Sequence, residues 1–375
     1  MKMIPSLLCA TLASLVGTAY SSPQGVATPT PLATAQTAAT SATAVACNNS
    51  PELCSRSYSN ITHMGAHDSS FVRDASTQNS IAGTQYFNAT VALDAGIRLL
   101  QVQVHDLNGS IELCHTSCTL LDAGPLKDWL SEVKLWMDRN PHDVVTLLIV
   151  NSDGQSAAQF GAMFEASGIS KYGYTPAANG WPTLQSMIDT NKRLVTFIAS
   201  VTPSSTYPYL LSEFDHVFET PYEITSLSGF NCTLDRPSGQ RTAAAALSAG
   251  LLPLMNHFAY KDLGSSIMIP DIDDVLATNS PSTSASSPGA LGLHAQTCRQ
   301  QWGFKPTFVL VDFFSEGPAI KTADGLNGIA NPVGRKNDTI ADADTAAHEA
   351  TGGRNVADTV TGSLIGFLVA ALLLV

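Results

Sequence analysis

The sequence is poor in charged residues, and positive charge is the scarcer sign. Only 13% of the residues are charged, and 19 Lys and Arg stand against 31 Asp and Glu, a formal net charge of −12. Binding to a nucleic-acid backbone needs clustered Lys and Arg, which this chain lacks. We therefore expect no nucleic-acid partner, and no basic patch for docking on anionic lipid is visible.

Long apolar runs are also missing. The two apolar ends, residues 4–16 and 364–375, are both shorter than the roughly 20 residues of a membrane-spanning helix. The first follows Lys2 and precedes small residues, which predicts a secretory signal peptide over residues 1–19, with a buried N-terminal helix as the alternative. The second follows small residues and a polar spacer, the pattern of a signal for a glycosylphosphatidylinositol (GPI) anchor. A weak membrane span or a terminal core helix is the alternative there.

Cysteine is scarce, and its spacing is informative. Of seven cysteines, six remain once Cys9 leaves with the signal, as expected for a secreted, oxidised protein. The spacing favours the pairs Cys47–Cys54, Cys114–Cys118 and Cys232–Cys298. A zinc site is the weaker alternative, because the short pairs lie in different contexts. Six N-x-S/T sequons also fit a secreted glycoprotein: Asn48, Asn60, Asn88, Asn108, Asn231 and Asn337.

Composition divides the rest of the chain into one folded domain and two flanking segments. Residues 20–46 are rich in Ser, Thr, Ala and Pro and predict a flexible linker. Residues 335–363 have a similar composition and predict a stalk that carries the anchor attachment site. Between them, residues 47–334 are expected to form one folded domain.

Within that domain, apolar runs of strand length alternate with helical patterns. We expect strands at residues 60–65, 97–104, 144–150, 194–199, 216–219, 252–255 and 307–313, and helices at residues 125–139, 156–166 and 239–249. Strands that are nearly continuous in Val, Ile and Leu, each followed by a helix, indicate a parallel sheet covered on both faces. The number of units favours a (β/α)₈ TIM-type barrel over a three-layer sandwich.

Three polar residues lie where such a barrel gathers its chemistry. His67 follows the first strand, His115 lies between two cysteines after the second, and Asp312 interrupts the apolar last strand. In a closed barrel the last strand lies beside the first, so Asp312 is expected to face and orient His67. Each residue also has an ordinary interpretation: a loop histidine, a structural cap beside a disulfide, and an acid bound to backbone amides.

These residues belong to longer motifs that resemble a known family. The segments "GAHDS", "GIRLLQVQVHDLNGSIELCHTSC" and "FVLVDFF" are similar to the catalytic X domain of phosphatidylinositol-specific phospholipase C, in particular to the secreted fungal phospholipase C-like phosphodiesterases. The resemblance spans nearly the whole folded region. It implies an incomplete TIM barrel that cleaves a phosphodiester with two histidines.

The resemblance also implies residue roles. His67 would take the proton of the inositol 2-hydroxyl, which attacks phosphorus to form a cyclic phosphate. His115 would protonate the leaving alkoxide and later activate water. Asp312 would orient His67, Asp68 corresponds to the acid that follows the first histidine of the motif, and Asn151 lies near a position that contacts substrate.

The second strand departs from the family pattern. Gln101 and Gln103 stand where animal relatives carry calcium ligands and bacterial relatives an aspartate and an arginine. Neutral amides bind Ca²⁺ poorly and do not neutralise a charged transition state, so no metal or other cofactor is expected. His105 is on the same strand face as both glutamines and is a candidate for the missing positive charge, with an exposed strand-end histidine as the alternative.

The sequence therefore predicts a metal-independent phosphodiesterase at the cell surface, GPI-anchored, that acts on a phosphoinositide-like or GPI-like lipid or another phosphodiester. The alternative is a catalytically weak or inactive barrel that binds a ligand. A third hypothesis is a metal-dependent enzyme of the glycerophosphodiesterase or sphingomyelinase D kind, which needs carboxylates where the glutamines stand.

Overall fold

The structure is a computed structural model that describes residues 45–336, except residues 178–179, 241 and 265–266. The predicted signal peptide, nearly all of the linker and stalk, and the apolar tail lie outside the described residues. The predictions of secretion, of an anchor and of the segment boundaries therefore stay predictions.

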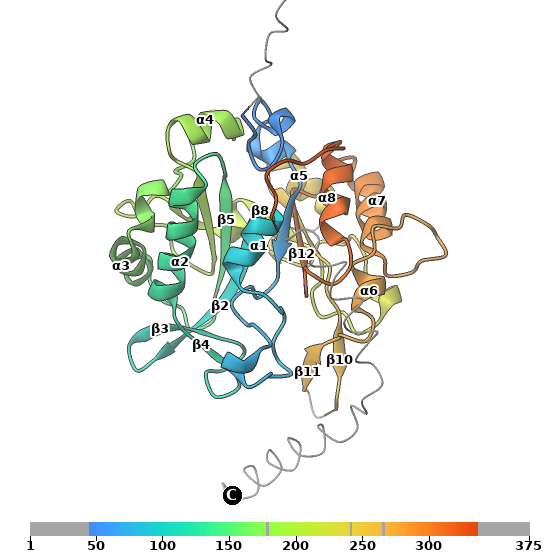
Figure 1. Ribbon diagram of the computed structural model, residues 1–375, viewed down its shortest axis with the longest axis horizontal. Coiled ribbons are helices and arrows are strands. Elements are labelled where there is room, and N and C mark those ends of the chain that lie inside the picture. Colours follow the sequence, from blue (N-terminus) through green and yellow to red (C-terminus); the bar gives the residue numbers. More distant parts are fainter. Residues whose placement is uncertain (1–44, 178–179, 241, 265–266, 337–375) are drawn as a thin grey trace, which may run out of the picture. The chain divides into compact units, whose positions relative to one another are not determined.

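A curved sheet of eight parallel strands forms the centre of the described region (Figure 1). These strands are β1 (His63–Ala66), β2 (Leu99–Leu107), β5 (Val145–Asn151), β6 (Leu194–Ala199), β7 (Leu210–Ser212), β8 (Val217–Glu219), β9 (Leu252–Asn256) and β12 (Phe308–Val311). Their order in the sheet is β7-β6-β5-β2-β1-β12-β9-β8, so the strands follow one another as in a closed barrel except between β7 and β8, which are the two edges. The prediction of an incomplete TIM-type barrel is confirmed.

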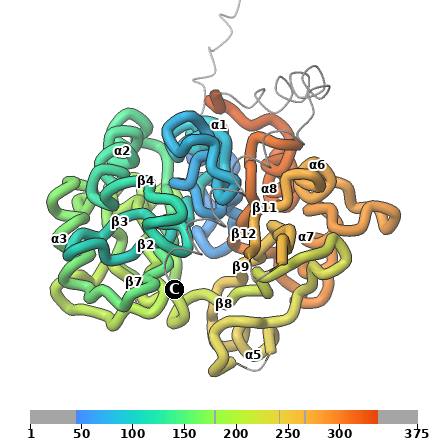
Figure 2. Tube along the Cα trace, turned by 90° about the horizontal axis from the view of Figure 1, so that it is seen from below, coloured from blue at the N-terminus to red at the C-terminus, as the bar shows by residue number. Residues whose placement is uncertain are grey.

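Helices surround this sheet, most of them on its outside. They are α1 (Ala89–Ala95), α2 (Leu126–Arg139), α3 (Ala157–Ser167), α4 (Leu184–Asp189), α5 (Ala243–Ser248), α6 (Val275–Thr278), α7 (Leu291–Trp302) and α8 (Ala319–Asn327). In Figure 2, α2 and α3 lie to the left of the strands, and α6, α7 and α8 lie to their right. The predictions for α2 and α3 are confirmed within a residue at each end, whereas α5 is shorter than predicted because it begins only after the side-chain cap at Thr242.

Alternation along the strands produces two separate cores. On β12, Phe308 and Leu310 pack inside the barrel, whereas Val309 and Val311 pack between the sheet and the outer helices. On β2, Leu99 faces inward and Leu100 outward in the same way. Both faces of each strand are thus buried, which explains why the strands read as continuous apolar runs.

Additional antiparallel strands extend β2 beyond the barrel. β3 (Ser110–Cys114) pairs with β2, and β4 (Asp122–Pro125) pairs with β3. A separate hairpin of β10 (Tyr260–Asp262) and β11 (Met268–Pro270) follows β9 and projects at the bottom of Figure 1. The three predicted disulfides, Cys47–Cys54, Cys114–Cys118 and Cys232–Cys298, are confirmed.

The last strand differs from its prediction. It ends at Val311, and Phe313 has a left-handed backbone with φ of 44°. Asp312 is therefore not in the middle of a strand, as we expected, but at the turn that follows one. The turn takes the backbone out of the hydrogen-bonded ladder. The buried Asp312 carboxylate can then point toward a neighbouring strand.

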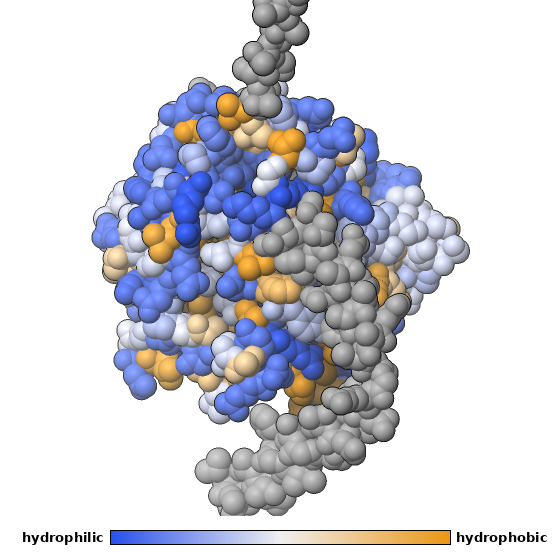
Figure 3. Space-filling model, in the orientation of Figure 1, coloured by the Kyte–Doolittle hydropathy of each residue, from blue (hydrophilic) through white to orange (hydrophobic). Residues whose placement is uncertain are grey.

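The surface is mostly hydrophilic on the face seen in Figure 3, where apolar side chains form small separate groups. Among the described residues, no helix has the length and apolar character needed to span a membrane. The sequon residues Asn60, Asn88, Asn108 and Asn231 are exposed. Asn48 is buried and accepts a hydrogen bond from the Val144 backbone, so a glycan does not fit there in the folded protein.

Candidate active site

The carboxyl ends of β1 and β12 bring His67 and Asp312 together. The two strands pair in parallel, with Ala66 opposite Val311, so the residues that follow are neighbours. His67 Nδ1 donates to Asp312 Oδ1 at 2.7 Å, and both side chains are buried. This bond assigns a hydrogen to Nδ1 and leaves the lone pair of the neutral ring on Nε2.

Asp68 lies between His67 and His115. Its Oδ2 is 3.7 Å from His67 Nε2 and 3.3 Å from His115 Nε2, so the two ring nitrogens are separated by at most the sum of these distances, about 7.0 Å. His115 is brought to this point because the β2–β3 hairpin folds back along β2, and the edge of its ring faces Phe71. A group that accepts a proton and a group that donates one can thus act on one small substrate.

The carboxylates determine the protonation of His67. Burial favours the neutral ring, but the negative charges of Asp68 and Asp312 outweigh burial and raise the pKa of His67 above its ordinary value of 6.5. Burial also acts on Asp68, yet the two histidines and a hydrogen bond from Gln101 lower its pKa overall. For Asp312, burial is the larger effect and raises its pKa.

The two glutamines of β2 fasten loops to the strand. Gln101 Oε1 accepts from the Asp68 backbone N–H at 2.5 Å. Gln103 donates to Ser152 Oγ at 3.0 Å and accepts from the Thr116 backbone N–H at 2.9 Å, which holds the loop that carries His115. Both side chains line the pocket that the histidines share, but much of their hydrogen-bonding capacity is used by the protein, and their predicted contact with substrate stays a prediction.

Two of the predicted substrate-binding residues lie elsewhere. His105 Nδ1 contacts Asp153 at 3.2 Å, and His105 does not line the pocket. The Asn151 carboxamide bonds both backbone groups of Gln155, donating at 2.9 Å and accepting at 2.9 Å, so it closes the turn after β5. No contact tests their predicted roles, which stay predictions.

The pocket contains a cation that the sequence analysis missed. Arg236 forms an ion pair with the buried Glu219 at the end of β8, and its guanidinium stacks over Tyr222 at 4.3 Å. Glu219 also binds Glu213: burial raises the pKa of Glu213 well above its usual range, so its protonated carboxyl donates to ionised Glu219. Among the described residues that line the pocket, Arg236 is the one Lys or Arg.

Part of this set was detectable in the sequence. Glu219 is an acid at the end of a buried strand, whereas Asp312 was identified as an acid within an apolar run. Arg236 lies in a loop without a pattern, and Phe258, whose ring stacks on His67 at a centroid distance of 3.6 Å, follows β9 among other apolar residues. With these side chains the pocket has a volume of about 280 Å³.

This arrangement can now be compared with known proteins. Residues 53–327 match the family described as "PI-PLC X 1". The chain belongs to the PI-PLC X family. The match includes β1 to β12, and hence every residue of the pocket.

Several relatives of this X domain are known. "PI-PLC X domain-containing protein 1" of Arthroderma benhamiae is 38% identical over 289 residues, covering 76% of this chain and 90% of that protein. An "uncharacterized secreted protein" of the same organism is 36% identical over 295 residues, covering 76% of this chain and 64% of that one. Phosphatidylinositol-specific phospholipase C from Listeria monocytogenes superposes with a TM-score of 0.47 at 14% identity, covering 74% of this chain and 95% of that structure.

Among the described residues of this X domain, few possible metal ligands lie close together. Within the described residues, the one group of three His, Cys, Asp or Glu close enough to share an ion is Cys232, His294 and Cys298. The two sulfur atoms form a disulfide and so do not act as thiolate ligands. In the pocket, Glu219 forms an ion pair with Arg236, and Asp68 Oδ2 lies 3.3 Å from His115 Nε2 and 3.7 Å from His67 Nε2.

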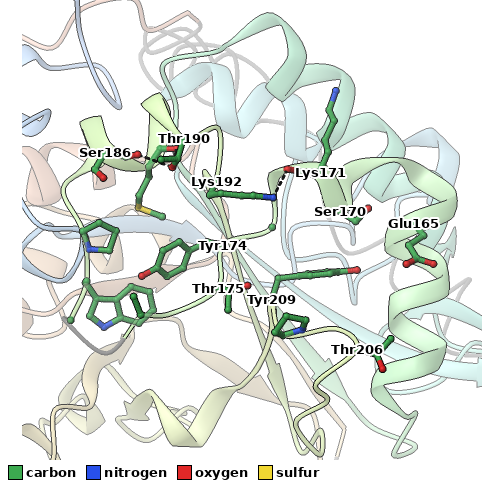
Figure 4. Close-up of a pocket in the computed structure, with 17 residues that line it drawn as sticks. Glu165, Ser170, Lys171, Tyr174, Thr175, Ser186, Thr190, Lys192, Thr206 and Tyr209 are labelled. Carbon is green, nitrogen blue, oxygen red and sulfur yellow. Dashed lines mark hydrogen bonds between the residues drawn. The ribbon is translucent and has the colours of Figure 1, made fainter.

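A wider depression of the X domain lies near the β6–β7 edge of the sheet (Figure 4). Its volume is about 800 Å³, and Tyr174, Trp181 and Tyr209 contribute aromatic walls. Lys192 points along it and donates to the Lys171 backbone carbonyl. Its lining contains neither His67 nor His115, which both line the smaller pocket.

Proposed function

We propose that the protein is a phosphodiesterase of the phospholipase C type that cleaves a phosphoinositide-like or GPI-like lipid without a metal ion. The observation that supports it is the convergence of His67 Nε2 and His115 Nε2 on one carboxylate, with Asp312 holding the opposite side of His67. Paired histidines at this spacing suit one proton removal and one proton delivery on the two sides of a phosphorus atom.

The proposed reaction has two steps. In the first, His67 Nε2 takes the proton of the inositol 2-hydroxyl, the oxygen bonds to phosphorus, and the bond from phosphorus to the lipid oxygen breaks. His115 gives its proton to that oxygen, so a diacylglycerol leaves and a cyclic inositol phosphate forms. In the second step His115 takes a proton from water, the water oxygen opens the cyclic ester, and His67 returns its proton to the 2-hydroxyl.

Arg236 supports this proposal because phosphoryl transfer needs positive charge around the pentacoordinate phosphorus. The guanidinium lines the same pocket as the histidines, and burial of Glu219 beneath it orients it. In the proposal, Arg236 therefore supplies the positive charge for which the sequence had suggested His105. It either binds the phosphate directly or binds the hydroxyls of the head group, since a guanidinium offers five donors.

The proposed location is the outer face of the plasma membrane. The signal-like start, the apolar tail and the sequons support secretion with a GPI anchor, and a relative is named a secreted protein. A small pocket at the barrel mouth is suited to a head group, with the lipid chains left in the membrane.

The decisive experiment uses the chain expressed in a eukaryotic host and purified. It is incubated with phosphatidylinositol in mixed micelles, with other phosphodiesters and with a GPI-linked protein, and products are followed by phosphorus NMR with and without chelator. We expect a cyclic phosphate, unaffected by chelator, and its loss on the order of 10³-fold in His67→Ala and in His115→Ala. His142→Ala, at an exposed histidine outside the pocket, is the matched control.

Other outcomes decide between hypotheses. Loss of turnover with chelator would contradict the metal-independent mechanism. A wild-type protein that binds these lipids without forming product would favour the ligand-binding module. Arg236→Lys keeps the positive charge but removes the planar set of hydrogen-bond donors. We expect it to raise KM and lower kcat because a lysine does not reproduce bidentate binding.

A further inference from the structure

The two strands that carry the candidate base and its acid both end in an unusual turn. Asp68, directly after His67, and Phe313, directly after Asp312, have left-handed backbones with φ of 46° and 44°. This conformation is costly for residues other than glycine, less so for Asp than for Phe. Something in the structure must therefore stabilise the two turns.

The dipeptide Thr84–Gln85 contacts both turns. It lies between the first barrel strand and α1, and both side chains are completely buried. Thr84 Oγ1 donates to the Asp68 carbonyl at 3.0 Å, and the Thr84 carbonyl accepts from the Phe313 N–H at 2.8 Å. One residue thus binds the two left-handed positions from opposite sides.

Gln85 completes the connection with its side chain. Nε2 donates to the His67 carbonyl at 2.7 Å and to the Val311 carbonyl at 3.1 Å, and Oε1 accepts from the Phe314 N–H at 3.0 Å. Both N–H bonds of the carboxamide are used, and all three partners are backbone groups of the catalytic turns. The chain turns away from the sheet here, and Gln85 supplies a partner for the His67 carbonyl and the Phe314 N–H, whereas the Val311 carbonyl also accepts from the His67 N–H at 2.9 Å.

We infer that Thr84 and Gln85 are positioning residues that hold the His67 ring against the Asp312 carboxylate by fixing the backbone on both sides of the pair. Neither touches the pocket, and neither exchanges a proton with substrate. A shift of His67 relative to Asp312 would loosen the 2.7 Å bond that keeps the His67 hydrogen on Nδ1. The expected loss of kcat rests on the proposed function. The expected change in the contact between His67 and Asp312 does not.

The first test is a double-mutant cycle. Gln85→Met keeps the length of the side chain and removes its three hydrogen bonds, and Asp312→Asn breaks the ion pair directly. If Gln85 acts through the pair, Gln85→Met lowers kcat on the order of 10²-fold in the wild type with little change in KM, and only a few-fold in Asp312→Asn. Equal factors in both backgrounds would overturn the inference.

The second test needs no activity. The imidazole resonances of histidine-labelled protein are titrated by NMR, and His67 is assigned by the signal that is missing in His67→Ala. We expect the pKa of His67 to fall toward 6.5 in Gln85→Met, because looser contact with Asp312 removes part of the charge that raises it. An unchanged pKa would contradict the inference even if no substrate is ever found.

Two further variants separate positioning from general stability. Thr84→Val removes the hydroxyl that bonds the Asp68 carbonyl and, at 3.5 Å, the Phe71 carbonyl. It should produce the same changes on a smaller scale, which covers the case that Gln85→Met does not fold. Gln159→Met removes a carboxamide that caps α3, away from the pair. It should lower the melting temperature without moving the His67 titration, and a titration that moved equally would overturn the inference.

Discussion

His67 has a carboxylate near each ring nitrogen, Asp312 at Nδ1 and Asp68 at Nε2. Both favour the imidazolium, so the pKa of the ring lies above 6.5 although the ring is buried. A general base must be neutral before it can accept a proton. The acid limb of the rate profile should therefore lie at a higher pH than an ordinary histidine would give.

Replacement of Asp312 tests this electrostatic account. Asp312→Asn removes one of the two charges that favour the imidazolium, so the pKa of His67 falls and the acid limb of kcat/KM moves to lower pH. The plateau rate should fall on the order of 10²- to 10⁴-fold, because the amide no longer orients the ring and its tautomer. The measurement is kcat/KM between pH 4 and pH 9 (a range of about five units, wide enough for a histidine limb), and a limb that stays in place or rises would contradict the account.

At this scale, the sequence supported the pair of His67 and Asp312 because barrel topology makes their strands neighbours. It did not predict the bridge through Asp68, since the left-handed turn that aims this side chain has no periodic signal. Nor did it predict that Gln103 is occupied by Ser152 and Thr116. Hydrogen bonds between distant loops depend on positions that only the folded chain provides.

Among the elements, the loop after β3 positions one of the two site histidines. It carries His115, which must reach Asp68 from an added hairpin rather than from a barrel strand. The Cys114–Cys118 disulfide encloses this histidine in a loop of sequence separation 4, whereas Cys232–Cys298 joins segments 66 residues apart. The short bridge is thus suited to local geometry, and the long one to global stability.

Removal of each bridge should separate these roles. Loop-closure entropy predicts a loss of about 2 kcal/mol for the Cys114→Ser/Cys118→Ser protein and about 4 kcal/mol for Cys232→Ser/Cys298→Ser. The first variant should nevertheless lose more turnover, because His115 is no longer held near Asp68. Urea unfolding and kcat measured on both variants check this, and a larger loss of kcat in the second would contradict it.

For the whole molecule, the open seam between β7 and β8 lies away from the strands β1, β2 and β12 that hold the histidines and Asp312. The site is therefore supported on the continuous part of the sheet, while Glu219 lies on the edge strand β8 and Arg236 in a loop that follows it. In the proposed function, head-group recognition and proton transfer would come from different parts of one barrel. This division follows from topology rather than from any single motif.

Anchoring is the prediction that belongs to the complete chain. If residues 364–375 are an anchor signal, a chain that lacks them is secreted into the medium, whereas the full chain stays on the cell surface and partitions into detergent. Cell fractionation and detergent partition of both forms give the measurement. Release of the full chain into the medium would refute the anchor without affecting the proposed chemistry.

The sequence by itself determined the parallel barrel, the three disulfides, and the pairing of His67 with Asp312. Each follows from short-range periodicity, from spacing along the chain, or from the rule that the last barrel strand adjoins the first. Only the tertiary structure decided that Asp68 joins the histidines, that Arg236 is in their pocket, and that Thr84 and Gln85 hold the turns. These depend on where irregular loops pack, and a loop's position is determined by long-range contacts that leave no repeating pattern in the sequence.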